Sequence, residues 1–400
     1  MMTSNTICSL PFNSVSVDPT GRLRPCCNAD SGVFPEDINV ISVDRIINNP
    51  SIQEIRKSLL NGIQDPRCSR CWKMEAVGNQ SFRNIANVDS DHGITSIAPD
   101  RFTEMIDYSN IRYLDITLGN KCNLACRMCH PGSSSLVAKQ YMELGYPFDS
   151  APMLEFDRTG KDKILELITK SVNLSSIYLL GGEPLINEFH DEIIELLIKI
   201  DKAKDVTLHY STNLHTDVEK HLERWSKFKL VEISVSIDGT EEVYEYIRWP
   251  GSWKKVYGNL KKVCDIAHND RKIVAGVAIT AQNLNVGNIP TLINAIQDIG
   301  SLVSYYFIPV TGCNNIEYTP THILEDAITR LLDLNDPYNR ISELSNYYKK
   351  AVTVKSSVTA YDVEKFFNRQ RDFDGFRKQN LFQTIPYFLD LAKEYNIKTW

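Results

Sequence analysis

The sequence predicts an α/β protein whose core is a parallel sheet built from repeated strand–helix units. From residue 111 to residue 310, short apolar segments of strand length alternate with longer amphipathic segments of helical periodicity. Repeated units of this kind require parallel strands, because each helix returns the chain to the same end of the sheet. A cysteine-rich segment precedes these units, and a segment with only helical periods follows them. The expected domains are therefore residues 1–110, 111–313 and 314–400.

Six strand–helix units are expected in the central domain. The strands are expected at residues 112–118, 176–180, 206–211, 230–237, 272–280 and 302–310. The helices are expected at 133–144, 161–172, 188–200, 217–227, 252–268 and 286–299. Helical periods recur in the last domain at 326–334, 342–350, 362–372 and 381–395, where aromatic residues are expected to pack in a core.

Composition indicates a water-soluble protein. The 400 residues are 42% hydrophobic and 24% charged, with a net charge of −6 that would not attract nucleic acid or acidic lipid. No apolar segment is long enough to span a bilayer, and the N-terminus lacks a secretory signal. We therefore expect a cytoplasmic protein that binds neither nucleic acid nor membrane, in a reducing compartment where cysteines bind metal rather than form disulfides.

Three cysteines follow the first expected strand of the central domain. Cys122, Cys126 and Cys129 are separated by three and by two residues. This spacing lets one short loop direct three thiolates at a compact inorganic core. A cubane iron–sulfur cluster has four irons, so three ligands leave one iron open for chemistry. The alternatives are a partial zinc site or three buried cysteines.

A second set of cysteines lies in the N-terminal segment. Alternation at 15–17, a turn containing Gly21 and a second alternating stretch predict a β-hairpin that brings Cys8 and Cys26 together. A Cys-x2-Cys motif follows at Cys68 and Cys71, so the set can form a closed four-thiolate site. Structural zinc is the alternative to a cluster, and Cys27 could replace Cys26. Residues 76–110 are expected to be a bridge, in which 81–83 form a solvated loop, with the lining of a cleft as the alternative.

At Cys122, Cys126 and Cys129 the sequence resembles the radical S-adenosylmethionine (radical SAM) superfamily, whose signature is this Cys-x3-Cys-x2-Cys loop. The resemblance implies a partial (β/α)6 TIM-like barrel and a [4Fe–4S] cluster whose open iron binds SAM. It also implies reductive cleavage of SAM to a 5′-deoxyadenosyl radical. The family often has an aromatic residue before the third cysteine, and Met128 stands there in this sequence. We expect Met128 to contact the cofactor.

The N-terminal set resembles the SPASM domain, which carries auxiliary iron–sulfur clusters in many radical SAM enzymes. The match comprises Cys8, Gly21, Cys26 and the Cys68/Cys71 pair. The further SPASM cysteines are missing, so the shortened Twitch form with one auxiliary [4Fe–4S] cluster is the better match. The usual order places this domain after the barrel, whereas here it comes first.

The resemblance also implies where SAM binds, at the carboxyl ends of the strands. The expected contacts are Gly181, Gly182, Glu183, Pro184, Ser211, Asn213 and Ser236. Arg248 resembles an arginine found after the fourth strand in SPASM-type enzymes and could hold a carboxylate, although a surface arginine fits equally well. For the other expected contacts, the alternative is that they form ordinary turns or cap them.

The sequence therefore indicates a radical SAM enzyme with a catalytic and an auxiliary cluster. Relatives with SPASM and Twitch domains often modify peptides or proteins, so a peptidyl substrate is the first expectation. A small metabolite such as a sugar or nucleotide is the alternative, and a redox-sensing or zinc-structured binding protein is the alternative from another class. Flavodoxin or ferredoxin is the expected electron donor. The sequence predicts no residue that acts catalytically on the substrate.

Overall fold

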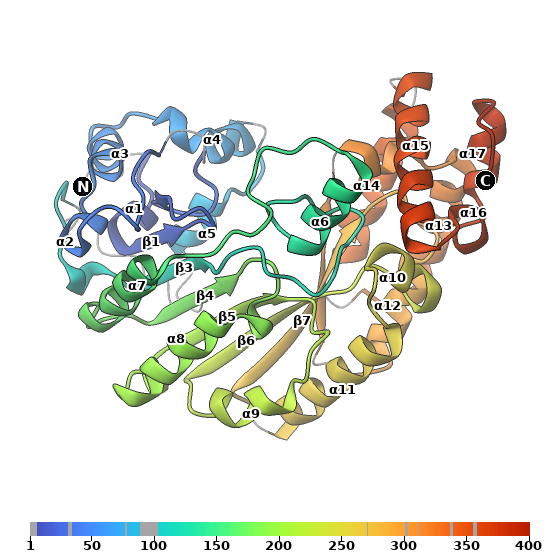
Figure 1. Ribbon diagram of the computed structural model, residues 1–400. Coiled ribbons are helices and arrows are strands. Elements are labelled where there is room, and N and C mark those ends of the chain that lie inside the picture. The colour runs from blue at the N-terminus through green and yellow to red at the C-terminus, as the bar shows by residue number, and fades with distance from the viewer. Residues whose placement is uncertain are drawn as a thin grey trace. The chain divides into compact units, whose positions relative to one another are not determined.

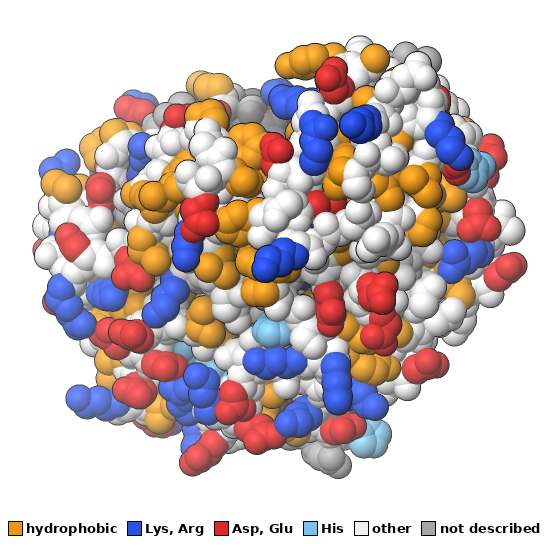
Figure 2. Space-filling view, turned by 45° about the vertical axis from the view of Figure 1, so that its right-hand side comes forward, with side chains coloured by type: hydrophobic (Ala, Val, Ile, Leu, Met, Phe, Trp, Pro, Cys, Tyr) orange, Lys and Arg blue, Asp and Glu red, His pale blue; other side chains and the backbone are white. Residues whose placement is uncertain are grey.

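The computed structural model describes most of the chain. The described residues are 6–30, 34–76, 78–88, 103–269, 271–300, 303–310, 312–336, 339–354 and 358–400. In this part of the chain no helix is both long enough and apolar enough to cross a membrane. On the molecular face in Figure 2, basic and acidic side chains are intermixed.

The N-terminal segment contains the expected hairpin. Strands β1 (Ser14–Val17) and β2 (Leu23–Arg24) pair antiparallel, and Gly21 takes a positive φ of 87° in the turn between them. Strand β1 also pairs in parallel with β3 (Tyr113–Thr117), so the hairpin extends the sheet of the strand–helix units. The helices of this segment are α1 (Leu10–Asn13), α2 (Val43–Ile46), α3 (Pro50–Leu60), α4 (Ser69–Ala76) and α5 (Phe82–Val88).

The six expected strands all form, which confirms the predicted α/β class (Figure 1). In hydrogen-bonded order the eight described strands run β2-β1-β3-β4-β5-β6-β7-β8, with β2 and β8 at the open ends. The β3–β4, β4–β5 and β7–β8 pairs are parallel. The remaining strands are β4 (Ser176–Leu180), β5 (Thr207–Thr212), β6 (Leu230–Ser236), β7 (Ile273–Ala281) and β8 (Ser304–Pro309).

Helices alternate with these strands as a partial barrel requires. They are α6 (Ser135–Leu144), α7 (Arg158–Lys170), α8 (Glu188–Lys199), α9 (Glu219–Trp225), α10 (Glu241–Ile247), α11 (Trp253–Asn269) and α12 (Ile289–Gln297). Helix α10 was not expected from the sequence. It begins after Thr240 and has Glu241 and Glu242 in its first turn, where carboxylates favour a helix N-terminus.

The C-terminal region is helical, as expected. Its helices are α13 (Thr321–Leu332), α14 (Arg340–Val354), α15 (Ala360–Arg377), α16 (Leu381–Thr384) and α17 (Phe388–Glu394). The single helix expected over residues 381–395 is wrong, because two short helices replace it. Pro386 follows α16 directly after Ile385, and proline disfavours a helical residue before it. Buried Phe366, Phe367 and Phe388 form the expected aromatic core.

The structure forms two compact units, which we describe separately. The first comprises residues 1–121, 153–211 and 219–232, and the second comprises 122–152, 212–218 and 233–400. The core of the first unit includes Phe12, Ile55 and Trp72 around the N-terminal cysteines. The core of the second unit joins α10 to the C-terminal helices. The division into three domains remains a prediction.

Candidate metal centres

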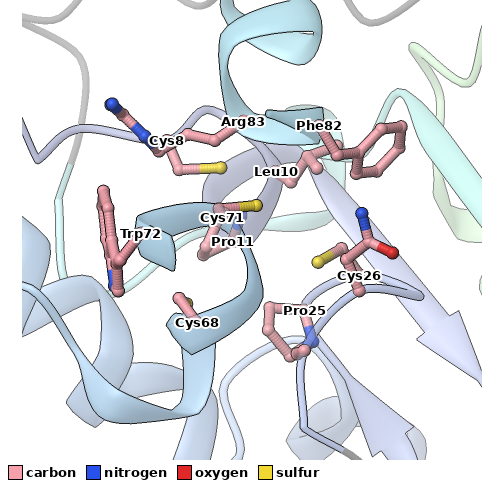
Figure 3. A pocket seen from close by; sticks show the side chains of 12 residues that line it. Cys8, Leu10, Pro11, Pro25, Cys26, Cys68, Cys71, Trp72, Phe82 and Arg83 are labelled. Carbon is pink, nitrogen blue, oxygen red and sulfur yellow. The ribbon is translucent and has the colours of Figure 1, made fainter. Parts of the chain in front are cut away.

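Four cysteines of the first unit line one pocket. Cys8 lies just before α1, Cys26 follows β2, Cys68 ends a 3-10 turn and Cys71 lies on α4. The Asp65 side chain caps the 3-10 turn by accepting from the Arg67 amide at 3.0 Å. Figure 3 shows the sulfurs of Cys8 and Cys71 turned toward Cys26, whose sulfur points back at them. The predicted set of four is therefore brought together.

The pocket suits a bound metal centre. Burial, with the neighbouring thiols, raises the pKa of Cys8 and of Cys68 to about 12, and burial also raises the pKa of Cys26. Four thiolates cannot gather there without a cation, because burial and their mutual repulsion disfavour the charged forms. A metal centre would supply that cation, and soft sulfur ligands select zinc or iron–sulfur clusters. The residues present therefore fit a closed four-thiolate site.

Cys27 is placed differently from Cys26. Its thiol lies beside the Asp115 carboxylate, which together with burial raises the pKa of Cys27. Cys27 is not among the residues that line the four-cysteine pocket, whereas Cys26 is. The geometry therefore favours Cys26 as the fourth ligand.

The segment at 81–83 also lines the pocket, so the expectation of a solvated loop is wrong. Ser81 is buried, and Phe82 and Arg83 are among the residues that line the pocket (Figure 3). The Arg83 guanidinium pairs with Glu75, donates to the Ile7 carbonyl at 2.7 Å and lies over the Trp72 ring at 4.8 Å. These bonds tie α5 to α4 and close one side of the pocket.

The three-cysteine loop belongs to the second unit. Cys126 is buried, and Cys122 and Cys129 are half-buried. The Leu124 amide donates to the Cys122 sulfur at 3.4 Å, and the Cys129 amide donates to the Cys126 carbonyl at 3.0 Å. A hydrogen bond from Cys129 and the charge of Arg248 lower the pKa of Cys126 to about 7, although burial opposes them. The same hydrogen bond and burial raise the pKa of Cys129. The loop thus favours thiolate at Cys126, the form that binds metal.

Two buried arginines hold this loop to the C-terminal helix α15. Arg127, between the second and third cysteines, pairs with Asp374 at 2.6 Å and donates to Gln370 at 2.6 Å. Its guanidinium lies 3.6 Å from the centre of the Tyr246 ring. Arg377 donates to the Ala125 carbonyl at 2.7 Å. The sequence reasoning missed both contacts, although a charged residue inside a buried metal loop signals a buried partner.

The residues expected after the third and fourth strands of the barrel lie close to the loop. The Asn213 amide donates to Asn123 at 2.8 Å and to the Cys122 sulfur at 3.9 Å. Ser236 is half-buried at the end of β6. Arg248 is buried, donates to the Cys126 sulfur at 3.6 Å and pairs with Asp238 at 2.7 Å. It is therefore not a surface arginine, and Asp238 is a partner that the sequence reasoning did not name.

Met128 and Cys129 line a second pocket, which opens from the loop toward α15. Its other lining includes Tyr141, Cys313 and Arg369. Cys313 is half-buried, whereas Cys264 on α11 is buried.

The Gly-Gly-Glu-Pro element lies in the first unit, directly after β4. Gly181 and Gly182 have φ values of 98° and 54°, and a Cβ on Gly182 would lie 2.1 Å from the Lys121 carbonyl oxygen. Glycine is therefore required where this turn packs on the segment just before Cys122. The Glu183 amide donates to the Lys121 carbonyl at 2.9 Å, and its buried carboxylate accepts from the Leu185 amide at 3.1 Å. The buried Pro184 begins the short turn that follows.

Ser211, the remaining expected contact, ends β5 in the first unit. Its hydroxyl lies 2.5 Å from the Tyr178 hydroxyl on β4. It is half-buried, so it remains accessible for a ligand contact.

Comparison with known families agrees with both metal centres. The family model of the radical SAM superfamily matches residues 116–285, which include the three-cysteine loop and the Gly-Gly-Glu-Pro element. The model of an iron–sulfur cluster-binding domain, SPASM, matches residues 8–72, which include all four N-terminal cysteines.

Curated relatives match about half of the chain. A probable GTP 3′,8-cyclase from Methanocaldococcus jannaschii is 28% identical over 205 residues, which are 50% of this chain and 60% of the relative. A GTP 3′,8-cyclase from Clostridium botulinum is 26% identical over 167 residues, or 41% of this chain and 46% of the relative. The chain thus spans less than two thirds of the length of these relatives.

Solved structures resemble the chain weakly. Native anSMEcpe with bound AdoMet has a TM-score of 0.40 at 16% identity, covering 55% of this chain and 60% of that one. SuiB from Streptococcus suis bound to S-adenosylmethionine has a TM-score of 0.36 at 12% identity, covering 80% and 66%. The two matched family models and the two cysteine sites thus agree that the chain carries a radical SAM domain over residues 116–285 and a SPASM-type iron–sulfur domain over residues 8–72.

Proposed function

We propose that this protein cleaves SAM reductively at the three-cysteine loop and uses the resulting radical to abstract hydrogen from a small-molecule substrate, such as a nucleotide. The observation that carries the proposal is the pairing of two unequal thiol sets in one chain. Three thiols lie on one loop, and four line a closed pocket. Three ligands leave a cubane one open iron, whereas four leave none.

Cys122, Cys126 and Cys129 would hold the catalytic [4Fe–4S] cluster. With SAM on its open iron, that cluster supplies the 5′-deoxyadenosyl radical. The residues around the loop fix its shape and charge. Asn213 contacts the Cys122 sulfur, and Arg248 donates to the Cys126 sulfur. N–H bonds to thiolate sulfur stabilise added negative charge, which favours reduction of the cluster.

Met128, Gly181, Gly182, Glu183, Pro184, Ser211, Asn213 and Ser236 are the residues proposed to contact SAM. Glycines at 181 and 182 let this turn pack closely on the backbone of residues 119–121, and a buried carboxylate such as Glu183 accepts strongly from an ammonium group. Arg248 is proposed to act on the cofactor through its hydrogen bond to the Cys126 sulfur. Its guanidinium is engaged by Asp238 and Cys126, which leaves less capacity for a substrate carboxylate.

Cys8, Cys26, Cys68 and Cys71 are proposed to hold the auxiliary [4Fe–4S] cluster. With four protein ligands, such a cluster has no position for SAM or substrate, so electron transfer is its proposed use. Flavodoxin or ferredoxin remains the proposed donor of electrons to the protein.

The substrate class rests on sequence similarity. The curated relatives named GTP 3′,8-cyclase act on a nucleotide, which supports the small-molecule alternative over the peptidyl substrate first expected from the sequence. A peptidyl substrate remains a prediction without independent support, because the peptide-binding neighbour is similar only at a TM-score of 0.33.

Metal analysis of anaerobically reconstituted protein tests this proposal. We expect about eight irons per chain, two cubanes' worth, and about four in the variant Cys122→Ala/Cys126→Ala/Cys129→Ala. Incubation with SAM and dithionite should release deoxyadenosine from the wild type alone. A wild type that holds about four irons and one tightly bound zinc would mean that the four-cysteine pocket binds structural zinc instead of an auxiliary cluster. A wild type that holds iron and releases no deoxyadenosine would favour a redox-sensing or binding protein.

A further inference from the structure

A row of polar side chains crosses one face of the sheet in the first unit. Asp115 on β3 is in register with Tyr178 on β4, and Tyr178 is in register with His209 on β5. The neighbouring Tyr210 contacts His190 of α8 and Trp225 of α9. Because successive side chains of a strand point to opposite faces, the row lies on the face away from these two helices. Polar residues there are not needed to pack the helices.

Asp115 is the most unusual member of the row. It is 1% exposed, and its carboxylate accepts only from the Cys27 thiol, a weak donor, while no nitrogen or oxygen donor of the described residues bonds to it. Burial raises its pKa to about 6, while Cys27 and Arg24 act in the opposite direction. In its ionised form the carboxylate can only accept hydrogen bonds. A buried carboxylate with one weak donor is costly and has acceptor capacity left for a bound group.

The protein groups around Asp115 leave most of the acceptor capacity of its two oxygens unused. Arg24 on β2 donates to the Cys27 carbonyl at 3.5 Å. Ser16 on β1 is in register with both Arg24 and Asp115, and its hydroxyl is buried without a partner. The half-buried Cys27 thiol lies beside the carboxylate, so a ligand would have to turn this side chain aside.

The rest of the row offers aromatic surface and further polar atoms. The rings of Tyr178 and His209 meet edge to face with centres 6.3 Å apart. The Tyr178 hydroxyl bonds to Ser211, and the His209 Nδ1 lies 2.9 Å from Glu232. The face therefore combines a carboxylate acceptor with planar rings, which suits a flat nitrogen-rich ligand.

We propose that Asp115 is a specificity residue that binds a planar ligand edge carrying two parallel N–H donors. Such an edge occurs on guanine, at N1 and the exocyclic amine, and on a guanidinium group. A carboxylate accepts from both donors at once, and this bidentate contact distinguishes guanine from adenine, whose N1 is an acceptor. The inference rests on the proposed function, because it names the chemical class of that substrate.

The variant Asp115→Asn tests the proposal in protein that carries both clusters. An amide keeps one acceptor and gains a donor, so it complements xanthine, which has a carbonyl where guanine has the amine. We expect Asp115→Asn to bind GTP at least ten-fold more weakly than the wild type and XTP more tightly, by equilibrium dialysis. The wild type should also bind ITP, which lacks the amine, more weakly than GTP. The matched control is Asp44→Asn, whose carboxylate is 81% exposed and which should leave every affinity unchanged.

Further outcomes separate this inference from the proposed function. If the wild type releases deoxyadenosine but does not bind GTP, arginine amide is the second probe. Wild-type binding of arginine amide that is lost in Asp115→Asn would support the Asp115 site while overturning a nucleotide substrate. GTP bound equally by wild type and Asp115→Asn, or neither probe bound by the wild type, would overturn the inference. Iron content and circular dichroism of the variant should match the wild type, because the substitution replaces a buried carboxylate by a neutral amide of the same shape.

Discussion

The four-cysteine pocket and the three-cysteine loop differ most in the cations that surround them. Among the described residues that line the pocket, Arg83 is the only arginine or lysine, and Glu75 pairs with it. The loop includes one buried arginine, Arg127, and contacts two more, Arg248 and Arg377. Burial raises the pKa values of Cys8 and Cys68 in the pocket, whereas in the loop the pKa of Cys126 is lowered and that of Cys129 is raised by the hydrogen bond between them.

This difference indicates different uses for two sites of similar ligand chemistry. Buried cations near a cluster stabilise its reduced, more negative state. A site that must deliver an electron into SAM has to be reduced first, so cations at the loop serve that step. The pocket, with fewer cations and four ligands, suits a centre that is structural or passes electrons on.

The largest expected effect on stability comes from the ion pair that holds the loop to α15. Arg127 and Asp374 have side chains 0% and 1% exposed, so Asp374→Asn would leave a buried arginine without its counter-charge. We expect a loss of about 3–5 kcal/mol in the free energy of unfolding, measured with urea. The control Asp162→Asn breaks the exposed pair with Arg158 and should change stability by about 0–1 kcal/mol. Equal losses of stability in the two variants would contradict the account that the Arg127–Asp374 pair holds the loop to α15.

A smaller effect, on the midpoint potential of the loop cluster, is expected from Arg377, the buried arginine that lacks a carboxylate partner. Arg377 bonds to Gln140 and to the Ala125 carbonyl, and within the described part of the chain no carboxylate pairs with it. Arg377→Gln should lower the midpoint potential of the loop cluster, followed by electron paramagnetic resonance during a redox titration. Arg377→Lys keeps the charge and should stay near the wild-type value. A shift of the same size in both variants would show that packing, rather than charge, sets the potential.

The sequence predicted those features that depend on local pattern. Strand and helix periods, the two cysteine sets and the Gly-Gly-Glu-Pro turn each lie within a few neighbouring residues, so spacing alone identifies them. The helix break before Pro386 was also a local signal, and its omission was an error of interpretation.

The features that could not be predicted join distant segments. Arg127 meets Asp374 across 247 residues, and no periodicity in either segment indicates the partner. The parallel pairing of β1 with β3 likewise depends on packing rather than on local pattern. Asp115 lay inside an expected strand, and its burial beside Cys27 is visible only from the fold.

The central claim is that SAM cleavage requires the loop alone and that the pocket serves a later step. The variant Cys68→Ala/Cys71→Ala tests it most directly, with deoxyadenosine release measured under dithionite and folding checked by circular dichroism. We predict folded protein with about four irons that still releases deoxyadenosine, because all three ligands of the open cluster lie between Cys122 and Cys129. Folded protein that retains the loop cluster and no longer cleaves SAM would contradict the claim.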